Sequence, residues 1–339
     1  MQSARLERRH RGGDWMRFYG IDSRGAHARV AEATERTPIV RIPSLDERIE
    51  LLAKLENRQN EGAFKARGAW NNLSQLTQAE RERGVIATSS GNHGRALAWA
   101  AKRAGVKATI VMPKDAYPNK IAACREHGAE VILGDTREHA EQLCRERVEA
   151  GALLVHPYDD DRTIEGAGTV GVEIAQDCGG ADVVVVPVGG GGLIAGTSLA
   201  LRLELGGRPW ILGAEPAGAP SMALGLAAGE GVLLDAITTN VQGLCPLSAG
   251  ERNVAICLET IDGVGLLPDE AIYAAQKRLV QLGEVVEPAG AAATALVDAG
   301  LIPEEWLEGK TKDDPLRVVV VVSGGNPAPE QLAALRGEK

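Results

Sequence analysis

The sequence predicts an α/β protein with two lobes, each built on a mostly parallel sheet flanked by helices. Short apolar strands alternate with stretches of helical spacing from Val85 onward, which is the pattern of βαβ units. The last predicted strand, residues 317–322, is a run of valines typical of a strand buried on both faces. A chain of 339 residues is long enough for two lobes.

The first βαβ series runs from residue 85 to residue 155. We expect its strands at 85–88, 108–112, 131–133 and 153–155, and its helices at 93–103, 118–126 and 137–150. The second series has helices at 163–176 and 193–205, with strands at 183–186 and 210–214. Residues 158–161 lie between the two series and are the best candidate for a hinge, and a cleft between lobes is a common place for a small ligand.

Composition excludes several classes of protein. The net charge of -9 argues against a nucleic-acid partner, and no run of 18 apolar residues predicts a membrane span. An odd number of scattered cysteines without a CxxC pair indicates free thiols, a reducing compartment and a cytoplasmic location. The first 20 residues carry several arginines interrupted by acidic residues and glycines, so we expect a frayed, solvated arm there.

A glycine loop is the first motif with chemical meaning. Gly189, Gly190, Gly191 and Gly192 separate a valine-rich strand from a helix that opens at Leu193. Backbone N–H groups of such a loop can wrap a phosphate at the helix N-terminus. Gly190-x-Gly192-x-x-Ala195, with Glu215 after the next strand, also satisfies the dinucleotide fingerprint, so this motif alone leaves a nicotinamide cofactor open.

Lys65 is a candidate amine nucleophile or base. It lies in the segment GAFKARGA at 62–69, where few other charges occur. Partial burial there would lower the pKa of its amine. Taken alone, however, a lysine is far more often a surface residue on a helix, so the case for Lys65 rests on the other motifs.

Two further motifs supply hydroxyl and amide groups. SSGNHG at 89–94 follows a predicted strand and opens a helix, so it is either a carboxylate or phosphate site or a helix cap made by Asn92 or Ser90. His93 is either a general base or a polar residue of the first turn. Ser323 follows the last strand and precedes two glycines, which places its hydroxyl at the ligand edge of a parallel sheet or simply in a turn.

The four motifs together provide groups for an aldehyde, a phosphate and a ring nitrogen, which is the set that pyridoxal 5'-phosphate carries. In this order they resemble the fold-type II pyridoxal phosphate enzymes of the tryptophan synthase β-like fold, most closely the serine/threonine dehydratase and serine racemase group. TPIV at 37–40, KLEN at 54–57 and EPAGA at 287–291 also look like family segments. A nicotinamide cofactor would leave Lys65, Asn92 and Ser323 without a common purpose.

The resemblance implies roles for these residues. Lys65 would hold the cofactor as a Schiff base, Phe64 would pack on its ring, Asn92 would bond its phenolic oxygen, and Ser323 would meet its pyridine nitrogen. Gly189 to Gly192 and Leu193 would cradle the phosphate. The substrate carboxylate would be bound by Ser89, Ser90, Asn92 and His93, with a weaker backbone contact from Gly243. Lys65 and Ser90 would be the catalytic residues.

The family likeness also implies an organisation and a reaction. Residues 1–71 and 161–339 would form a large cofactor-binding domain, and 72–160 a small domain carrying the 89–94 substrate loop. The expected enzyme is a pyridoxal phosphate-dependent lyase that converts a β-hydroxy amino acid, by default threonine or serine, to a 2-keto acid and ammonia. A 3-substituted serine is another candidate substrate. A racemase using Lys65 and Ser90, or a threonine-synthase-like replacement enzyme, is the alternative, and a homodimer is expected.

Four places depart from the family pattern. Ala63 stands where a serine is common, and Ala167 where a glutamine is common. A divalent cation is held in many relatives by a Glu, a carbonyl and an Asp, but here Glu215 is followed by Ser221 at the Asp position. We therefore expect no metal. Residues 242–246 also differ, which affects the predicted substrate pocket.

Overall fold

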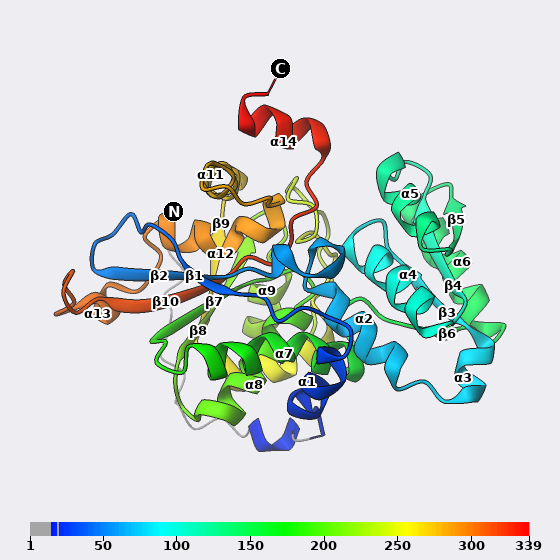
Figure 1. Cartoon of the computed structure of the whole chain (residues 1–339), viewed down its shortest axis with the longest axis horizontal. Helices are drawn as coiled ribbons and strands as arrows, with labels where there is room; N and C mark the ends of the chain where they lie inside the picture. Colours follow the sequence, from blue (N-terminus) through cyan, green and yellow to red (C-terminus); the bar gives the residue numbers. More distant parts are fainter. Residues whose placement is uncertain (1–14, 19, 339) are drawn as a thin grey trace.

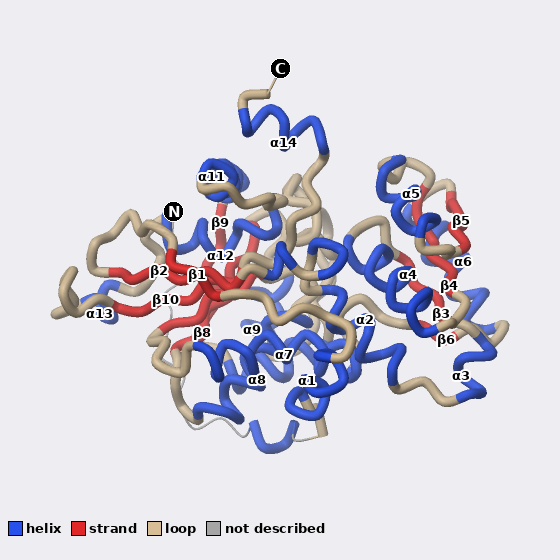
Figure 2. Tube along the Cα trace, viewed as in Figure 1, coloured by secondary structure: helices blue, strands red, loops and turns tan. Residues whose placement is uncertain are grey.

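The computed structural model describes residues 15–18 and 20–338 of the chain. Figure 1 shows two lobes side by side, and Figure 2 shows that each contains its own group of strands surrounded by helices. The larger lobe holds a six-stranded sheet of order β1-β2-β10-β7-β8-β9, and the smaller lobe a four-stranded sheet of order β5-β4-β3-β6. All pairs are parallel except β1 with β2. The predicted α/β class is confirmed.

The strands are β1 (Ile39–Arg41), β2 (Ile49–Lys54), β3 (Val85–Thr88), β4 (Ala108–Pro113), β5 (Glu130–Gly134), β6 (Leu153–Leu154), β7 (Val183–Pro187), β8 (Trp210–Pro216), β9 (Gly263–Leu267) and β10 (Leu316–Val321). Every strand predicted from the sequence is present, with ends that move by one or two residues. The strands β1, β2 and β9 were not predicted.

The α-helices are α1 (Ser23–Ala31), α2 (Lys65–Ser74), α3 (Gln78–Arg83), α4 (Asn92–Ala104), α5 (Pro118–Glu126), α6 (Arg137–Glu149), α7 (Asp161–Asp177), α8 (Gly192–Leu205), α9 (Ser221–Ala228), α10 (Glu251–Thr260), α11 (Asp269–Gln281), α12 (Pro288–Asp298), α13 (Glu304–Leu307) and α14 (Pro329–Arg336). Short 3-10 helices are η1 (Trp15–Phe18), η2 (Glu56–Arg58) and η3 (Asn60–Gly62).

The large sheet is covered on both faces, as its valine-rich strands predict. Val183 and Val185 of β7 pack in a core with α11 and α12, whereas Val184 and Val186 pack in a second core with α7, α8 and α10. Successive side chains of a strand point to opposite faces. A strand with helices on both sides therefore needs apolar residues at every position.

Helix α2 connects the two lobes. Ala69 and Leu73 belong to the small-lobe core together with β3, β4 and α4. On its other side, Asn72 donates to Thr163 of α7, with Nδ2–Oγ1 3.0 Å. The proposed domain boundary at residue 71 falls inside α2, and the division into 1–71 with 161–339 and 72–160 stays a prediction.

The described part of the N-terminal segment is not a frayed arm. Trp15 and Phe18 of η1 pack against the core beside α8 and α10. Arg17 pairs with Glu259 of α10 at 3.1 Å, so apolar contact and an ion pair fix these residues. The solvated-arm prediction is wrong for 15–18, and its remainder at 1–14 and 19 lies outside the described residues. No helix within 15–18 and 20–338 has the length and apolar character to cross a membrane.

Candidate active site

The first and last motifs lie against each other. Ala63 and Gly324 form an antiparallel bridge, the Phe64 N–H donates to the Ser323 carbonyl at 3.1 Å, and the Gly325 N–H donates to the Gly62 carbonyl at 2.7 Å. Ser323 lies two residues after the end of β10, which pairs with the central strand β7. The structure therefore brings Lys65 and Ser323, distant in sequence, to one edge of the large sheet.

Lys65 occupies the first position of α2. Its Nζ donates to the Pro157 carbonyl at 2.6 Å and lies 4.9 Å from the centre of the Phe64 ring. The side chain keeps some exposed area, but its amine is enclosed deeply enough that burial lowers the pKa of Lys65 to about 8. No carboxylate among the described residues pairs with it. Such an amine can lose its proton near neutral pH.

The glycine loop between β7 and α8 forms a backbone cradle. The N–H groups of Gly189, Gly190, Gly191 and Gly192 donate no hydrogen bond to the described chain, so they are free for an anion at the start of α8. A Cβ at Gly190 would lie 2.3 Å from the Tyr158 ring, and Gly191 adopts a φ of 91°. Only glycine fits these two positions, and Leu193 follows in the first turn of α8.

The 89–94 loop is shaped by Ser89. Its Oγ accepts the backbone N–H groups of Gly91 at 3.3 Å and Gly94 at 3.1 Å. The sequence left open that Asn92 or Ser90 caps this helix. The N-cap residue of α4 is instead Gly91, which has no side chain to cap it. Ser90 is partly exposed, and its hydroxyl makes no hydrogen bond to a described residue, which leaves it available to a ligand.

His93 is turned toward the interior of the small lobe. It is 4% exposed, and its Nε2 lies 2.9 Å from the Val155 carbonyl. Burial, with a smaller effect from the Lys65 charge, lowers the pKa of His93 to about 3. The ring is therefore neutral, and its predicted role in substrate binding stays a prediction.

Asn92 sits at the meeting point of both lobes. Its Nδ2 donates to Glu287 Oε1 at 2.5 Å, and its Oδ1 accepts from Asn326 Nδ2 at 2.9 Å. Burial raises the pKa of Glu287, against the hydrogen bond from Asn92. A Cβ at Gly324 would touch Glu287 Oε1 at 2.2 Å. Glu287 therefore lies in the same site as Ser323.

Residues 156–158 make contacts in the site that the sequence did not predict. The Tyr158 ring lies against Gly190 and stacks edge-on with His156 at 4.7 Å, while the Pro157 carbonyl holds Lys65. His156 Nδ1 accepts the Asp159 N–H at 2.8 Å, so the other ring nitrogen carries the proton when the ring is neutral. Of these residues only Tyr158 was part of a prediction, as the first residue of the candidate hinge at 158–161. Its aromatic residues beside a helix start were the available signal.

A second segment that closes the site is the loop around Gly243. Gly243 has a φ of 93°, and a Cβ at Gly189 would approach the Gly243 carbonyl at 3.0 Å. The preceding Gln242 accepts from Lys120 of the small lobe, with Nζ–Oε1 3.0 Å. The 242–246 segment, which differs from the family pattern, thus runs from the glycine loop to the small lobe.

Glu215 does not face a ligand. It is fully buried and its carboxylate accepts the Met222 N–H at 2.7 Å and the Ala223 N–H at 3.0 Å. Burial raises the pKa of Glu215 to about 7. The carboxylate is occupied by the start of α9, so it cannot serve as the ribose-binding acid of a dinucleotide site. Among the described residues, no three His, Cys, Asp or Glu side chains gather as ligands for a metal.

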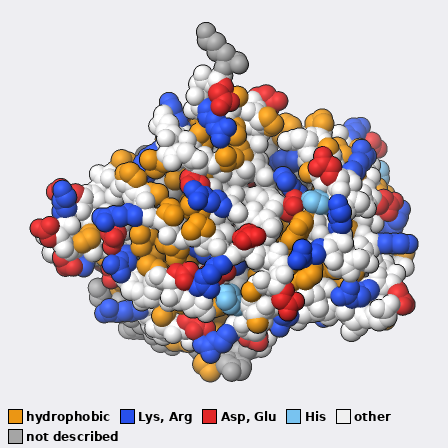
Figure 3. All heavy atoms as spheres, in the orientation of Figure 1, with side chains coloured by type: hydrophobic (Ala, Val, Ile, Leu, Met, Phe, Trp, Pro, Cys, Tyr) orange, Lys and Arg blue, Asp and Glu red, His pale blue; other side chains and the backbone are white. Residues whose placement is uncertain are grey.

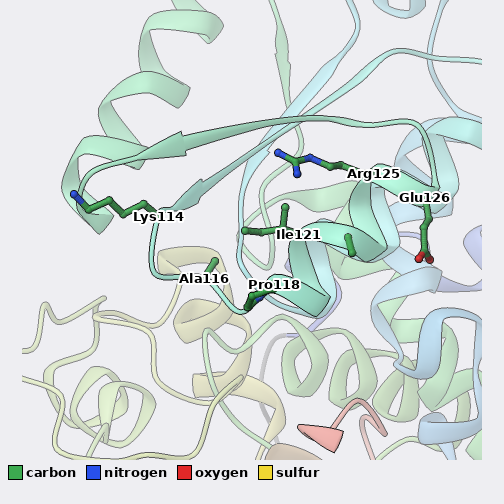
Figure 4. Close-up of a pocket in the computed structure, with 7 residues that line it drawn as sticks. Lys114, Ala116, Pro118, Ile121, Arg125 and Glu126 are labelled. Carbon is green, nitrogen blue, oxygen red and sulfur yellow. The ribbon is translucent and has the colours of Figure 1, made fainter.

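A surface pocket on the small lobe is separate from these groups. It measures about 590 Å³ and is lined along the end of β4 and helix α5 by Lys114, Ala116, Pro118, Ile121, Ala122, Arg125 and Glu126. In Figure 4, Lys114 extends away from the residues on α5, and its Nζ pairs with Asp135 at 3.1 Å. None of the residues of the four motifs lines this pocket.

An enclosed lysine amine, a backbone cradle for an anion and a hydroxyl at the edge of a parallel sheet define a site of the pyridoxal phosphate type. The family model described as "Pyridoxal-phosphate dependent enzyme" matches residues 30–324. The chain belongs to this family, and its cofactor is pyridoxal 5'-phosphate. The residues present fit that group. The N–H groups of the glycine loop are free to bind its phosphate, and the Lys65 amine, which has no carboxylate partner among the described residues, can react with its aldehyde.

Known proteins agree with this assignment. The chain is 37% identical to the catabolic L-threonine dehydratase of Staphylococcus aureus (strain USA300) over 90% of this chain and 88% of the relative. It is 34% identical to the serine racemase of Oryza sativa subsp. indica, covering 93% and 94%. The processed threonine deaminase isoform 2 of Solanum lycopersicum has a TM-score of 0.89 at 32% identity, covering 99% and 92%. The predicted family, fold and cofactor are confirmed.

Proposed function

We propose that this chain is a pyridoxal phosphate-dependent dehydratase and ammonia-lyase acting on a β-hydroxy amino acid, with threonine or serine as the default substrate. The observation that carries the proposal is the backbone pairing of the segment that contains Lys65 with the segment that contains Ser323. A neutral hydroxyl at a pyridine nitrogen does not hold that nitrogen protonated as a carboxylate would. This favours elimination at Cβ over transamination.

When bound, the cofactor supplies the electron withdrawal that acidifies the substrate Cα–H. Lys65 Nζ removes that proton, because its lowered pKa of about 8 leaves a basic amine near neutral pH. The N–H groups of Gly189 to Gly192 would hold the phosphate, and Phe64 would border the ring. The β-hydroxyl would leave with a proton as water, and hydrolysis of the imine form of the product by one water would release ammonia and leave a 2-keto acid.

The substrate carboxylate would lie at the N-terminus of α4. Ser89 shapes the turn by accepting the Gly91 and Gly94 N–H groups, and Ser90 offers an uncommitted hydroxyl. The helix dipole and the first N–H groups of α4 favour a negative charge there. The relatives named threonine dehydratase and threonine deaminase support this reaction. The 242–246 segment would then contact the substrate side chain.

A racemase is the second candidate, favoured by the free hydroxyl of Ser90 and by relatives named serine racemase. Ser90→Ala separates the two. Racemisation should fall by about 10²-fold or more, the usual contribution of a general acid or base, while elimination from the L-substrate is retained within a fewfold. Keto-acid formation and enantiomer ratio are measured with L- and D-serine, L- and D-threonine, 3-hydroxyaspartate and phenylserine.

Ser44→Ala, on the connection between β1 and β2, is the matched control for that experiment and should change neither activity. If Ser90→Ala abolishes elimination and racemisation together, the division of roles between Lys65 and Ser90 is wrong. If no substrate yields a keto acid while D-enantiomers accumulate, the racemase is the function.

We also propose a cytoplasmic homodimer. Large exposed side chains that support an interface belong to the large lobe and include Leu224, Leu233, Leu266 and Leu301. Figure 3 shows apolar side chains gathered over the large lobe on the face in view. Light scattering of the purified protein should give twice the chain mass, and a monomer across the micromolar range would contradict the dimer.

A further inference from the structure

Arg95 lies one turn after Asn92 on α4, on the same face of the helix. Its Nε donates to Glu61 Oε2 at 2.6 Å and its Nη1 to Asn326 Oδ1 at 3.2 Å. Glu61 also faces His127 of the small lobe, with Oε2–Nε2 3.0 Å. Its backbone adopts a φ of 59°, which is uncommon for a non-glycine residue and marks a strained, over-determined position.

The contacts of Arg95 determine which way the Asn326 amide points. A guanidinium can only donate and a backbone carbonyl can only accept. Asn326 therefore turns its oxygen to Arg95 and its nitrogen to the Glu61 carbonyl, at 2.7 Å. The same nitrogen donates to Asn92 Oδ1 at 2.9 Å. Two independent partners thus fix one amide orientation.

The orientation passes from Asn326 to Asn92. Because Asn92 meets Asn326 with its oxygen, its NH₂ group must face Glu287 and the site between the lobes. Glu287 alone cannot impose this, since burial raises the pKa of its carboxyl and a protonated carboxyl can donate as well as accept. The permanent donor in the chain of contacts is Arg95.

We propose that Arg95 is a positioning residue that, through Asn326, holds the Asn92 amide with its NH₂ group toward the phenolic oxygen of the cofactor. The inference rests on the proposed contact between Asn92 and that oxygen. Without Arg95, the Glu61 side chain also loses its ion pair at a strained backbone position, so the Glu61 carbonyl alone holds the Asn326 amide, and less firmly. The Asn326 and Asn92 amides can then turn over together, and an amide oxygen would face the phenolic oxygen. Two acceptors facing each other favour a proton on the cofactor oxygen.

The test is the absorption spectrum of the cofactor-bound protein without substrate. Asn326→Asp removes both donors of that side chain, and Arg95→Gln permits the amides to turn over. In each, the ratio of near-ultraviolet to visible cofactor absorbance should rise about tenfold, as loss of one hydrogen bond to a charged oxygen predicts. Arg95→Lys, still a donor without an acceptor, should keep the ratio within about twofold.

Arg125→Gln is the matched control, because Arg125 is an exposed residue of α5 beside the pocket of Figure 4, outside the four motifs. Unchanged spectra in both Arg95→Gln and Asn326→Asp would overturn the proposal. So would a spectrum of Arg95→Lys as altered as that of Arg95→Gln. If the protein without substitutions binds no cofactor at Lys65, the proposal that Lys65 binds the cofactor is wrong. That outcome is distinct from a change in the absorbance ratio.

Discussion

Two lysines whose amines are enclosed by the protein, Lys54 and Lys65, have opposite surroundings. Lys54 at the end of β2 is fully buried and donates to Glu173 Oε2 at 2.5 Å and to the Thr37 carbonyl at 2.6 Å. Lys65 donates to one carbonyl and has no carboxylate partner among the described residues. Charge compensation therefore separates a lysine that stabilises the fold from one that is available for chemistry.

Arg67 extends this contrast within α2. It lies two residues after Lys65, is fully buried, and pairs with Glu56 at 2.7 Å and Glu173 at 2.7 Å. Burial alone would lower the pKa of Arg67, but Glu56 and Glu173 outweigh it and raise that pKa. Two cations, Lys54 and Arg67, thus meet two carboxylates beneath the helix that carries Lys65. This network holds α2 while leaving the Lys65 amine unpaired.

The largest expected effect is the loss of turnover in Lys65→Ala. Removing the base alone should lower kcat by about 10²–10⁴-fold, and losing the covalent anchor adds to this. The free energy of unfolding of the cofactor-free protein should not fall, because no ion pair is broken. Steady-state kinetics and denaturant unfolding check both parts. A marked loss of stability would show that Lys65, like Lys54, stabilises the fold.

The next effect is the loss of stability in Lys54→Met. Removing one partner of a buried ion pair leaves Glu173 less compensated and should cost about 3–5 kcal/mol of unfolding free energy. Guanidinium unfolding measures it. Lys114→Met is the control, because Lys114 and Asp135 are 64% and 72% exposed and their pair should contribute no measurable stability. Equal effects of the two substitutions would contradict the contrast between buried and exposed pairs.

A smaller effect concerns the pH dependence of cofactor capture. Only the neutral amine attacks an aldehyde, and the pKa of Lys65 is lowered to about 8 by burial. The rate at which cofactor-free protein takes up pyridoxal phosphate should therefore rise with pH up to about 8 and level off above it. A rate that keeps rising toward the pKa of an ordinary lysine would show that Lys65 is solvated.

Local patterns predicted the elements and the motifs well. The valine run of β10 and the apolar β7 were predicted because a strand with helices on both faces needs apolar residues throughout. The four motifs predicted the cofactor because together they supply an amine, hydroxyls and an amide, and a backbone loop; three of them follow a strand, and the fourth opens α2. The sequence does not reveal which distant groups meet, so the contacts of Tyr158 with Gly190 and of Glu287 with Asn92 were not predicted.

Polar side chains with several available partners were the least predictable. Asn92 and Ser90 looked like helix caps, but Ser89 made the turn because its Oγ reaches the N–H groups of Gly91 and Gly94. Glu215 stood at the spacing of a ribose-binding acid, yet its carboxylate accepts two N–H groups of α9. The Ser89 hydroxyl and the Glu215 carboxylate both matched a ligand-binding role by their sequence position. In the structure, each accepts hydrogen bonds from backbone N–H groups a few residues away.

Borohydride reduction of the purified protein, followed by peptide mass analysis, tests most directly whether Lys65 is the lysine that binds the cofactor. Reduction makes the bond between lysine and cofactor permanent, so the modified residue can be located. The pyridoxyl group should be found on Lys65, and Lys54 should carry none. A group on Lys54, or a visible cofactor band that persists in Lys65→Ala, would contradict the assignment.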